Sequence, residues 1–171
     1  MYCERRPWLA QYIPWRARSA LEASMGGRPY WYFVDYNDDV NKALRDLRER
    51  AYRAGRYNAA MPFIDFPLNS DSPAPGPKHK SIEAAMKASR EDGTRSILDI
   101  EKVGANPDFR VAVPLEQSTL ESLYGTIQPT HDMVKNNLDF LEQVERGHCV
   151  YFIVYKGGKP SEILFAGYSF D

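Results

Sequence analysis

The chain has 171 residues, of which 43% are hydrophobic and 26% are charged, and its formal net charge is −1. This length and composition are typical of one globular domain and exclude disorder over the whole chain. Because the net charge is close to zero, a general attraction to nucleic acid or to anionic lipid is excluded, and such binding would need a local basic patch.

Aromatic residues are the unusual part of the composition, with 11 Tyr, 8 Phe and 3 Trp. So many large flat side chains can bury enough apolar surface for the chain to fold alone. Aromatic rings that the core does not need can form a binding face. Most of these residues fall in runs that predict strands.

The cysteines and the hydropathy pattern bear on the compartment. Cys3 and Cys149 stand near opposite ends of the chain, and two cysteines make no disulfide framework, which favours a reducing compartment. No apolar run approaches the roughly 20 residues of a membrane span. Residues 8–13 are too short and too polar for the core of a signal peptide. We therefore expect a cytoplasmic protein without membrane association.

Residues 1–27 differ from the rest of the chain, because arginines alternate there with aromatic and aliphatic side chains. One interpretation is a poorly packed tail, or sequence upstream of a true start at Met25. The other is an N-terminal arm that places Trp8 and Trp15 on a partner protein or on a second copy of the chain. Residues 28–171 are expected to form a single domain.

The first regular elements are a strand over residues 29–36 and a helix over residues 38–54. The strand is predicted by the run at residues 30–34, which is bulky on both faces. Asp39 and its neighbours supply a helix cap, and Gly55 supplies the end. The helix presents one apolar stripe at helical spacing, made of Val40, Ala43, Leu44, Leu47 and Ala51.

Residues 55–80 are predicted to form a long loop, since five prolines exclude regular structure from most of it. The apolar segment 61–68 is expected to lie against the domain, whereas residues 69–80 should be exposed. A loop of this length inside a compact domain is often functional when it is ordered.

The chain after the loop is predicted to combine short helices with strands. The elements expected are, in chain order, a helix begun by Ser81, strands over 95–101 and 108–114, a helix over 117–123, and a helix from Thr130 or Asp132 to Gly147. Strands over 148–156 and 161–170 then pair through the turn Gly157-Gly158 as a C-terminal hairpin. The fold class predicted is α+β: a single domain with a mixed, mostly antiparallel sheet of about five strands and helices mainly on one face.

Several reaction classes are excluded by missing motifs. The chain has no GxxxxGK[ST] phosphate loop, no GxGxxG, no GxSxG and no HExxH. It has no CxxC pair, and its three histidines are spread along the sequence, so neither a metal site nor a cofactor is predicted.

The turn at residues 124–132 is the first candidate site, because it places hydroxyl, amide and imidazole groups before a helix N-terminus. Free backbone N–H groups and the helix dipole would favour a small anionic ligand there. The structural alternative is that Thr130 caps the helix and Asp132 complements its dipole. The ligand-binding residues of this hypothesis are Tyr124, Gly125, Thr126, Gln128 and Thr130, with His131 as a catalytic group.

Asp99 and Glu101 form the second candidate. On a strand, positions two apart share one face and lie roughly 6–7 Å from each other. Two such carboxylates could divide acid and base roles, with Asp99 acting beside His131, or they could hold a divalent metal with help from residues elsewhere in the chain. The alternative is a solvated strand end that continues into Lys102.

The helix over residues 38–54 is the third candidate. The sequence from Lys42 to Arg56 contains six basic residues and only two acidic ones. Arg45 and other cations are expected to form ordinary helix pairs with acids four residues away. The remaining charge would contact an acidic protein surface or nucleic acid, with Arg45, Arg48 and Tyr52 as interaction residues.

Three functions follow from these features. The leading hypothesis is a regulatory, adaptor or accessory protein that binds a protein partner or itself through an aromatic sheet face and the N-terminal arm. The alternative is an enzyme that acts on a small anionic substrate at the 124–132 turn. Nucleic-acid binding through the basic helix ranks lowest, because the chain as a whole is not basic.

Overall fold

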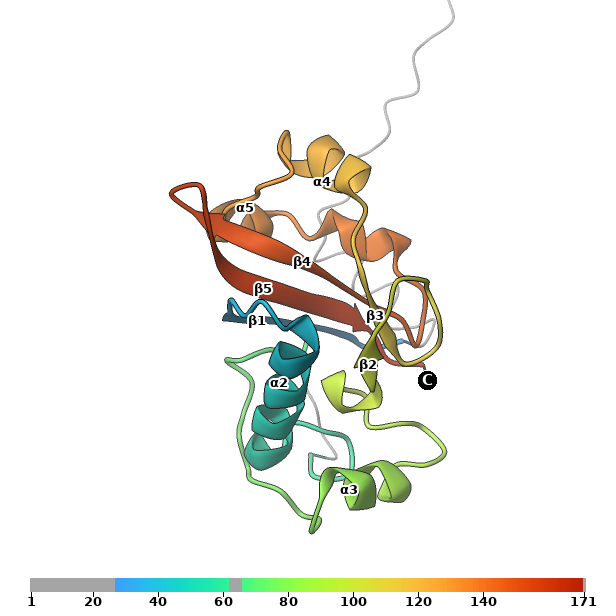
Figure 1. Ribbon diagram of the computed structural model, residues 1–171. Coiled ribbons are helices and arrows are strands. Elements are labelled where there is room, and N and C mark those ends of the chain that lie inside the picture. The colour runs from blue at the N-terminus through green and yellow to red at the C-terminus, as the bar shows by residue number, and fades with distance from the viewer. Residues whose placement is uncertain (1–26, 62–65, 171) are drawn as a thin grey trace, which may run out of the picture.

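The computed structural model describes residues 27–61 and 66–170, and in this part of the chain five strands form one open sheet (Figure 1). The strands are β1 (Pro29–Asp35), β2 (Lys102–Val103), β3 (Val111–Pro114), β4 (Cys149–Lys156) and β5 (Lys159–Tyr168). Their order across the sheet is β1-β5-β4-β3-β2, so the C-terminal hairpin β4-β5 lies inside the sheet and β1 forms one of its edges.

The α+β class and the C-terminal hairpin are confirmed, but the sheet is mixed rather than mostly antiparallel. β5 runs antiparallel to β1 and β4, whereas β3 runs parallel to β2 and β4. The parallel pairing of β3 with β4 is allowed because the helical segments between these strands form a crossover connection. The sequence indicates strands but does not fix their direction.

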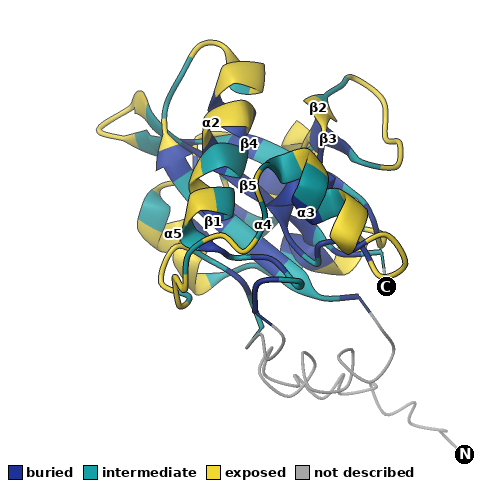
Figure 2. Cartoon of the chain, turned by 90° about the horizontal axis from the view of Figure 1, so that it is seen from below, coloured by how far each residue is buried: buried dark blue, intermediate teal, exposed yellow. Residues whose placement is uncertain are grey.

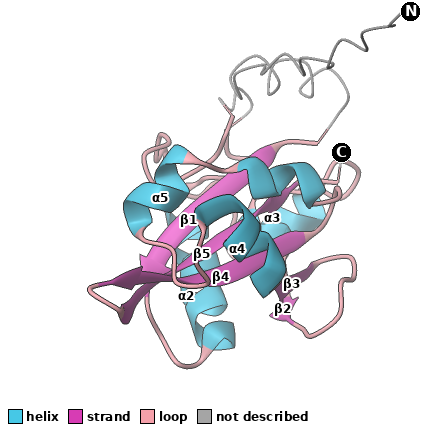
Figure 3. Ribbon diagram, turned by 90° about the horizontal axis from the view of Figure 1, so that it is seen from above, coloured by secondary structure: helices cyan, strands magenta, loops and turns pink. Residues whose placement is uncertain are grey.

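Helical segments cover both faces of the sheet, where the sequence predicted mainly one face (Figures 1 and 3). On one face lie α2 (Val40–Ala54), α3 (Ile82–Ala88) and the 3₁₀ turn η2 (Ile97–Asp99). On the other lie α4 (Gln117–Tyr124), α5 (His131–Asn136) and the 3₁₀ turn η3 (Asp139–Gln143). Two faces need covering because the central strands are apolar on both sides.

The alternation along β5 shows how one strand serves two cores. Ile163 and Phe165 belong to the core under α2, and Leu164 and Ala166 belong to the core under α4 and α5; all four are fully buried. Figure 2 shows the buried strands enclosed by helices whose outer faces are exposed. No helix among the described residues is long and apolar enough to cross a membrane.

Two local predictions were wrong because short polar side chains bond nearby backbone groups. The strand expected over 95–101 is replaced by η2, where the Ser96 hydroxyl accepts a hydrogen bond from the N–H of Leu98. The helix expected to run to Gly147 stops after α5, where the Asn137 side chain accepts a bond from the N–H of Asp139.

The proline-rich loop is ordered in its described part because it is tied to α2 and β1. Arg56 donates to the carbonyls of Ser70 and Ser72 at 2.7 and 3.1 Å. The N–H of Gly76 donates to Ala54, at the end of α2. Residues 69–80 are largely exposed, as expected, while Leu68 is fully buried and pairs with β1.

Candidate functional site

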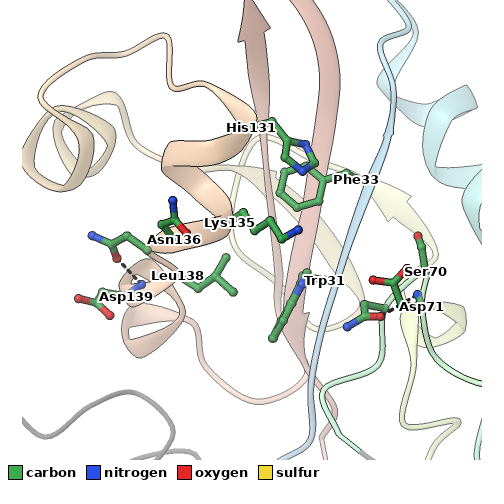
Figure 4. Close-up of a pocket in the computed structure, with 11 residues that line it drawn as sticks. Trp31, Phe33, Ser70, Asp71, His131, Lys135, Asn136, Leu138 and Asp139 are labelled. Atoms are coloured by element: carbon green, nitrogen blue, oxygen red, sulfur yellow. Dashed lines mark hydrogen bonds between the residues drawn. The ribbon is translucent and has the colours of Figure 1, made fainter.

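A groove of about 700 Å³ lies beside the edge strand β1, on the face covered by α5 and η3 (Figure 4). Its apolar floor is formed by Trp31, Phe33 and Leu138, which are only partly buried. One wall comes from α5 and η3, including His131 and Lys135, and the other comes from the loop at residues 69–71. Pockets of about 300–1,000 Å³ with apolar floors and a few polar groups are typical ligand sites.

The groove follows the outer edge of β1. The N–H of Trp31 donates to the carbonyl of Leu68 at 3.0 Å, and the N–H of Leu68 donates to Pro29 at 3.2 Å. Because outward and inward backbone groups alternate along an antiparallel edge strand, Phe33 directs its N–H and C=O to the same edge as Trp31. In the described part of the chain, Leu68 covers the edge only as far as Trp31.

His131 stands at the start of α5 and enters the groove. Its ring lies against Phe33, with 4.2 Å between ring centroids. Its Nδ1 lies 2.8 Å from the carboxylate oxygen Oε2 of Glu162 on β5. An ionised carboxylate only accepts, so Nδ1 carries the proton and donates, and in a neutral ring Nε2 is then the atom with a free lone pair. Acid–base chemistry in the groove is therefore chemically feasible.

The other residues of the 124–132 turn have structural roles. Thr130 caps α5, accepting from the N–H of Met133. The Tyr124 hydroxyl is part of the core and donates to the carbonyl of Asn137 at 2.7 Å; burial raises its pKa well above the ordinary value. Gly125 ends α4 in the left-handed conformation, and the Thr126 hydroxyl accepts from the N–H of Gln128. Of the residues in this turn, only His131 lines the groove.

Asp99 is buried and binds its own turn. Both carboxylate oxygens accept from the N–H of Thr94, at 2.9 and 3.1 Å. Burial raises the pKa of Asp99, and the hydrogen bonds from Thr94 oppose this shift. Glu101 does not share a face with it in a strand, because residue 99 lies in η2; Glu101 pairs instead with Arg110 at 3.0 Å.

His131 and Asp99 are not brought together. His131 contacts Glu162, near the start of β5, whereas the Asp99 carboxylate lies beside Gly93, which packs on Phe170 just beyond the end of β5. Tyr168 is six positions after Glu162, so at about 3.3 Å per residue the two places are roughly 20 Å apart along the strand. One small substrate cannot reach both groups.

Several basic side chains of α2 contact other groups of the molecule, in part through exposed ion pairs. Arg45 pairs with Asp39 at 3.7 Å, and Arg48 donates to the carbonyl of Leu98 at 3.0 Å. The Tyr52 hydroxyl donates to the carbonyl of His79. Two further cations form pairs four residues apart on the helix, Lys42 with Asp46 and Arg53 with Glu49. Three of the six cations between Lys42 and Arg56 are therefore paired with carboxylates, and Arg48 is held by a backbone carbonyl.

The aromatic side chains of the sheet are mostly core. Tyr30, Tyr32 and Phe165 are at most 2% exposed, so helices on both faces leave Trp31 and Phe33 as the aromatic pair in the groove. Trp8 and Trp15 lie outside the described residues. Within the described ranges, no three His, Cys, Asp or Glu side chains stand together in a group that could hold a metal ion.

Glu162 is the groove partner that sequence reasoning missed. It stands 31 residues after His131 in β5, and nothing in its neighbouring sequence marks it as a partner of a histidine. Comparison with known proteins adds nothing to the geometry: no family model, no curated protein and no solved structure matches the chain.

Proposed function

We propose that this domain is a binding module that holds an extended segment of a partner protein in the groove beside β1. One observation carries the proposal: the aromatic floor of Trp31 and Phe33 lies directly beside an edge strand that Leu68 pairs with only as far as Trp31 among the described residues. A peptide that adds to a sheet edge gains backbone hydrogen bonds, and adjacent side-chain pockets give it specificity.

The lining of the groove defines the chemistry of the segment. Trp31, Phe33 and Leu138 suit a large apolar or aromatic side chain. The charged residues of the lining are one cation, Lys135, and two carboxylates, those of Asp71 and Asp139. The preferred segment is therefore extended, carries at least one large apolar residue and has no excess of acidic residues.

A selection from a random peptide library displayed on phage tests the proposal, with the full chain as bait. Trp31→Ala and, separately, Phe33→Ala serve as counter-baits, and Phe109→Ala is the matched control because Phe109 is an exposed aromatic residue outside the groove. We expect enriched peptides that share a large apolar residue and that bind the Phe109→Ala variant as they bind the unaltered chain. Loss of one aromatic side chain from the floor should weaken binding about tenfold or more.

Two results would contradict the proposal. One is a selection that yields no sequence dependent on Trp31 or Phe33. The other is binding that falls equally in the Phe109→Ala control, which would place the contact elsewhere on the surface.

Acid–base catalysis on a small substrate in the same groove is the second candidate. The contact of 2.8 Å between His131 and Glu162 favours it, because a carboxylate that orients an imidazole is a recurrent arrangement for a general base. Assay of the full chain against small ester and amide substrates distinguishes the two functions. Catalysis requires turnover that is lost in His131→Asn, whereas a binding module shows no turnover in either the unaltered chain or the variant.

A further inference from the structure

A second hollow, independent of the groove, lies between the end of α3 and the start of β3. Its volume is about 470 Å³, and its lining includes Lys87, Ser89, Arg90, Asp99 and Arg110. It lies on the α3 and η2 side of the domain, close to the packing of Gly93 on Phe170.

Two polar atoms in the wall of this hollow are buried without hydrogen-bond partners among the described residues. They are the Ser89 hydroxyl oxygen and the Nε of Arg110. Ser89 is only 5% exposed, so its hydroxyl is shielded from bulk water. Buried polar groups are nearly always satisfied in folded proteins, and an unsatisfied pair at a hollow indicates a ligand, an ion or an ordered water.

Arg110 contacts two aromatic rings and a carboxylate in the wall. Its guanidinium lies over the rings of Phe109 and Phe170, at 5.5 and 5.9 Å from the ring centroids, and its NH1 pairs with Glu101 at 3.0 Å. Its backbone has φ of 64°, in the left-handed region that a non-glycine residue adopts at a cost. Strained residues of this kind cluster at ligand sites, where the rigid position of the donor is useful.

The charge of the lining is positive. Three cations, Lys87, Arg90 and Arg110, face one carboxylate, that of Asp99, whose oxygens already accept from Thr94. Glu101 offsets part of the charge of Arg110 from outside the hollow. With both carboxylates counted, one positive charge remains in excess, which favours an anion such as a phosphomonoester, whose charge at pH 7 is about −1.5 to −2.

We propose that this hollow is a binding site for the phosphate group of a small phosphomonoester, held by Arg90, Arg110 and Lys87 with the Ser89 hydroxyl as an additional donor. Arginine suits this role because its planar fork of donors matches phosphate oxygens. Asp99 opposes the bound anion, so its carboxylate limits the affinity. The site is separate from the groove and does not depend on the proposed peptide binding.

Isothermal titration of the full chain with glycerol 3-phosphate tests the proposal, with glycerol as the uncharged control. Saturable binding of glycerol 3-phosphate and none of glycerol is expected. Arg90→Ala should weaken binding about tenfold, the usual effect of losing a charge-assisted contact. Arg53→Ala, an exposed arginine on α2 away from the hollow, should leave the affinity unchanged.

Two further variants separate a binding role from a structural one. Ser89→Ala should weaken binding several-fold without lowering the urea midpoint of unfolding, because its hydroxyl has no partner among the described residues. Asp99→Asn should tighten binding, since it removes the opposing charge and keeps an oxygen for the N–H of Thr94. The proposal is overturned if glycerol 3-phosphate does not bind, or if Arg90→Ala and Ser89→Ala both bind it normally. A phosphoserine hexapeptide that binds when glycerol 3-phosphate does not would overturn the small-molecule assignment in favour of a modified protein segment.

Discussion

The carboxylate of Glu162 lies 2.8 Å from Nδ1 of His131, and this contact ties the start of α5 to the strand β5. The same helix start is fixed from the backbone, because the carbonyl of Pro129 accepts a hydrogen bond from the N–H of Tyr155 on β4. The position of the imidazole in the groove is therefore set by the two strands of the C-terminal hairpin, the best defined element of the sequence.

Glu162→Ala is expected to weaken peptide binding in the groove more than it lowers the free energy of unfolding. The side chains of His131 and Glu162 are 40% and 27% exposed, so their pairing should contribute less than about 1 kcal/mol. The ring of His131 would lose its fixed orientation, and the affinity for selected peptides should fall several-fold. Glu49→Ala is the matched control, because it removes the pair with Arg53 at 2.7 Å outside the groove. Equal affinities in the two variants would show that the orientation of His131 does not matter.

The pH dependence of stability should carry a contribution from Asp99. Burial raises the pKa of Asp99 in the folded state above its ordinary value of 3.8. Between the unfolded and the folded pKa the native state holds more protons, so this contribution to the free energy of unfolding falls as the pH rises. Urea unfolding across a pH series should show the unaltered chain losing stability relative to Asp99→Asn from about pH 4 upward, in the window that this pKa shift defines. A relative gain with rising pH would contradict the prediction.

Two glycines with the same backbone conformation offer a comparison of strain with packing. Gly55 and Gly125 have φ of 72° and 70°, so alanine at either position should cost about 1–2 kcal/mol from the backbone alone. A Cβ on Gly55 would clash with the carbonyl oxygen of Gly76, whereas one on Gly125 would have no neighbour within 4 Å. Gly55→Ala should therefore lower the free energy of unfolding by a further ~1–3 kcal/mol. Equal losses in the two variants would mean that the loop does not pack on the end of α2.

The Tyr57 hydroxyl should hold the described part of the proline-rich loop. It accepts from the N–H of Lys78 at 2.9 Å and lies 3.0 Å from Nδ1 of His79. Tyr57→Phe should lower the free energy of unfolding by about 1 kcal/mol. It should also raise the rate at which a protease cleaves within residues 69–80. The Tyr36 hydroxyl donates to the exposed carboxylate of Asp38, outside the loop. Tyr36→Phe should therefore leave the cleavage rate unchanged. An unchanged cleavage rate in Tyr57→Phe would mean that other contacts keep the loop ordered.

The parts of the fold that were predictable are those in which local chemistry and burial agree. The helix α2 has its cap at Asp39 and its end at Gly55, and the hairpin is apolar on both faces around Gly157-Gly158. The segment 95–101 was not predictable, because its apolar run indicates a strand while the side chains of Ser96 and Asp99 bind local N–H groups.

The candidate site was predictable only in one residue. His131 stood out because it precedes a helix in a polar turn, but its partner Glu162 is set by the tertiary arrangement of α5 on the hairpin. The groove itself exists because Leu68, from a loop without regular structure, pairs with β1 only as far as Trp31 among the described residues. Neither relationship leaves a pattern in neighbouring residues.

The backbone of Phe33 is the decisive place to measure, because peptide binding is proposed to continue the sheet at this residue. The measurement is amide hydrogen exchange by ¹⁵N NMR, on the full chain with and without the tightest peptide from the phage selection. Addition of the peptide should slow exchange at the N–H of Phe33 strongly and shift the resonances of residues 131–139. Unchanged exchange at Phe33, or shifts confined to the face covered by α2 and α3, would contradict binding along the edge of β1.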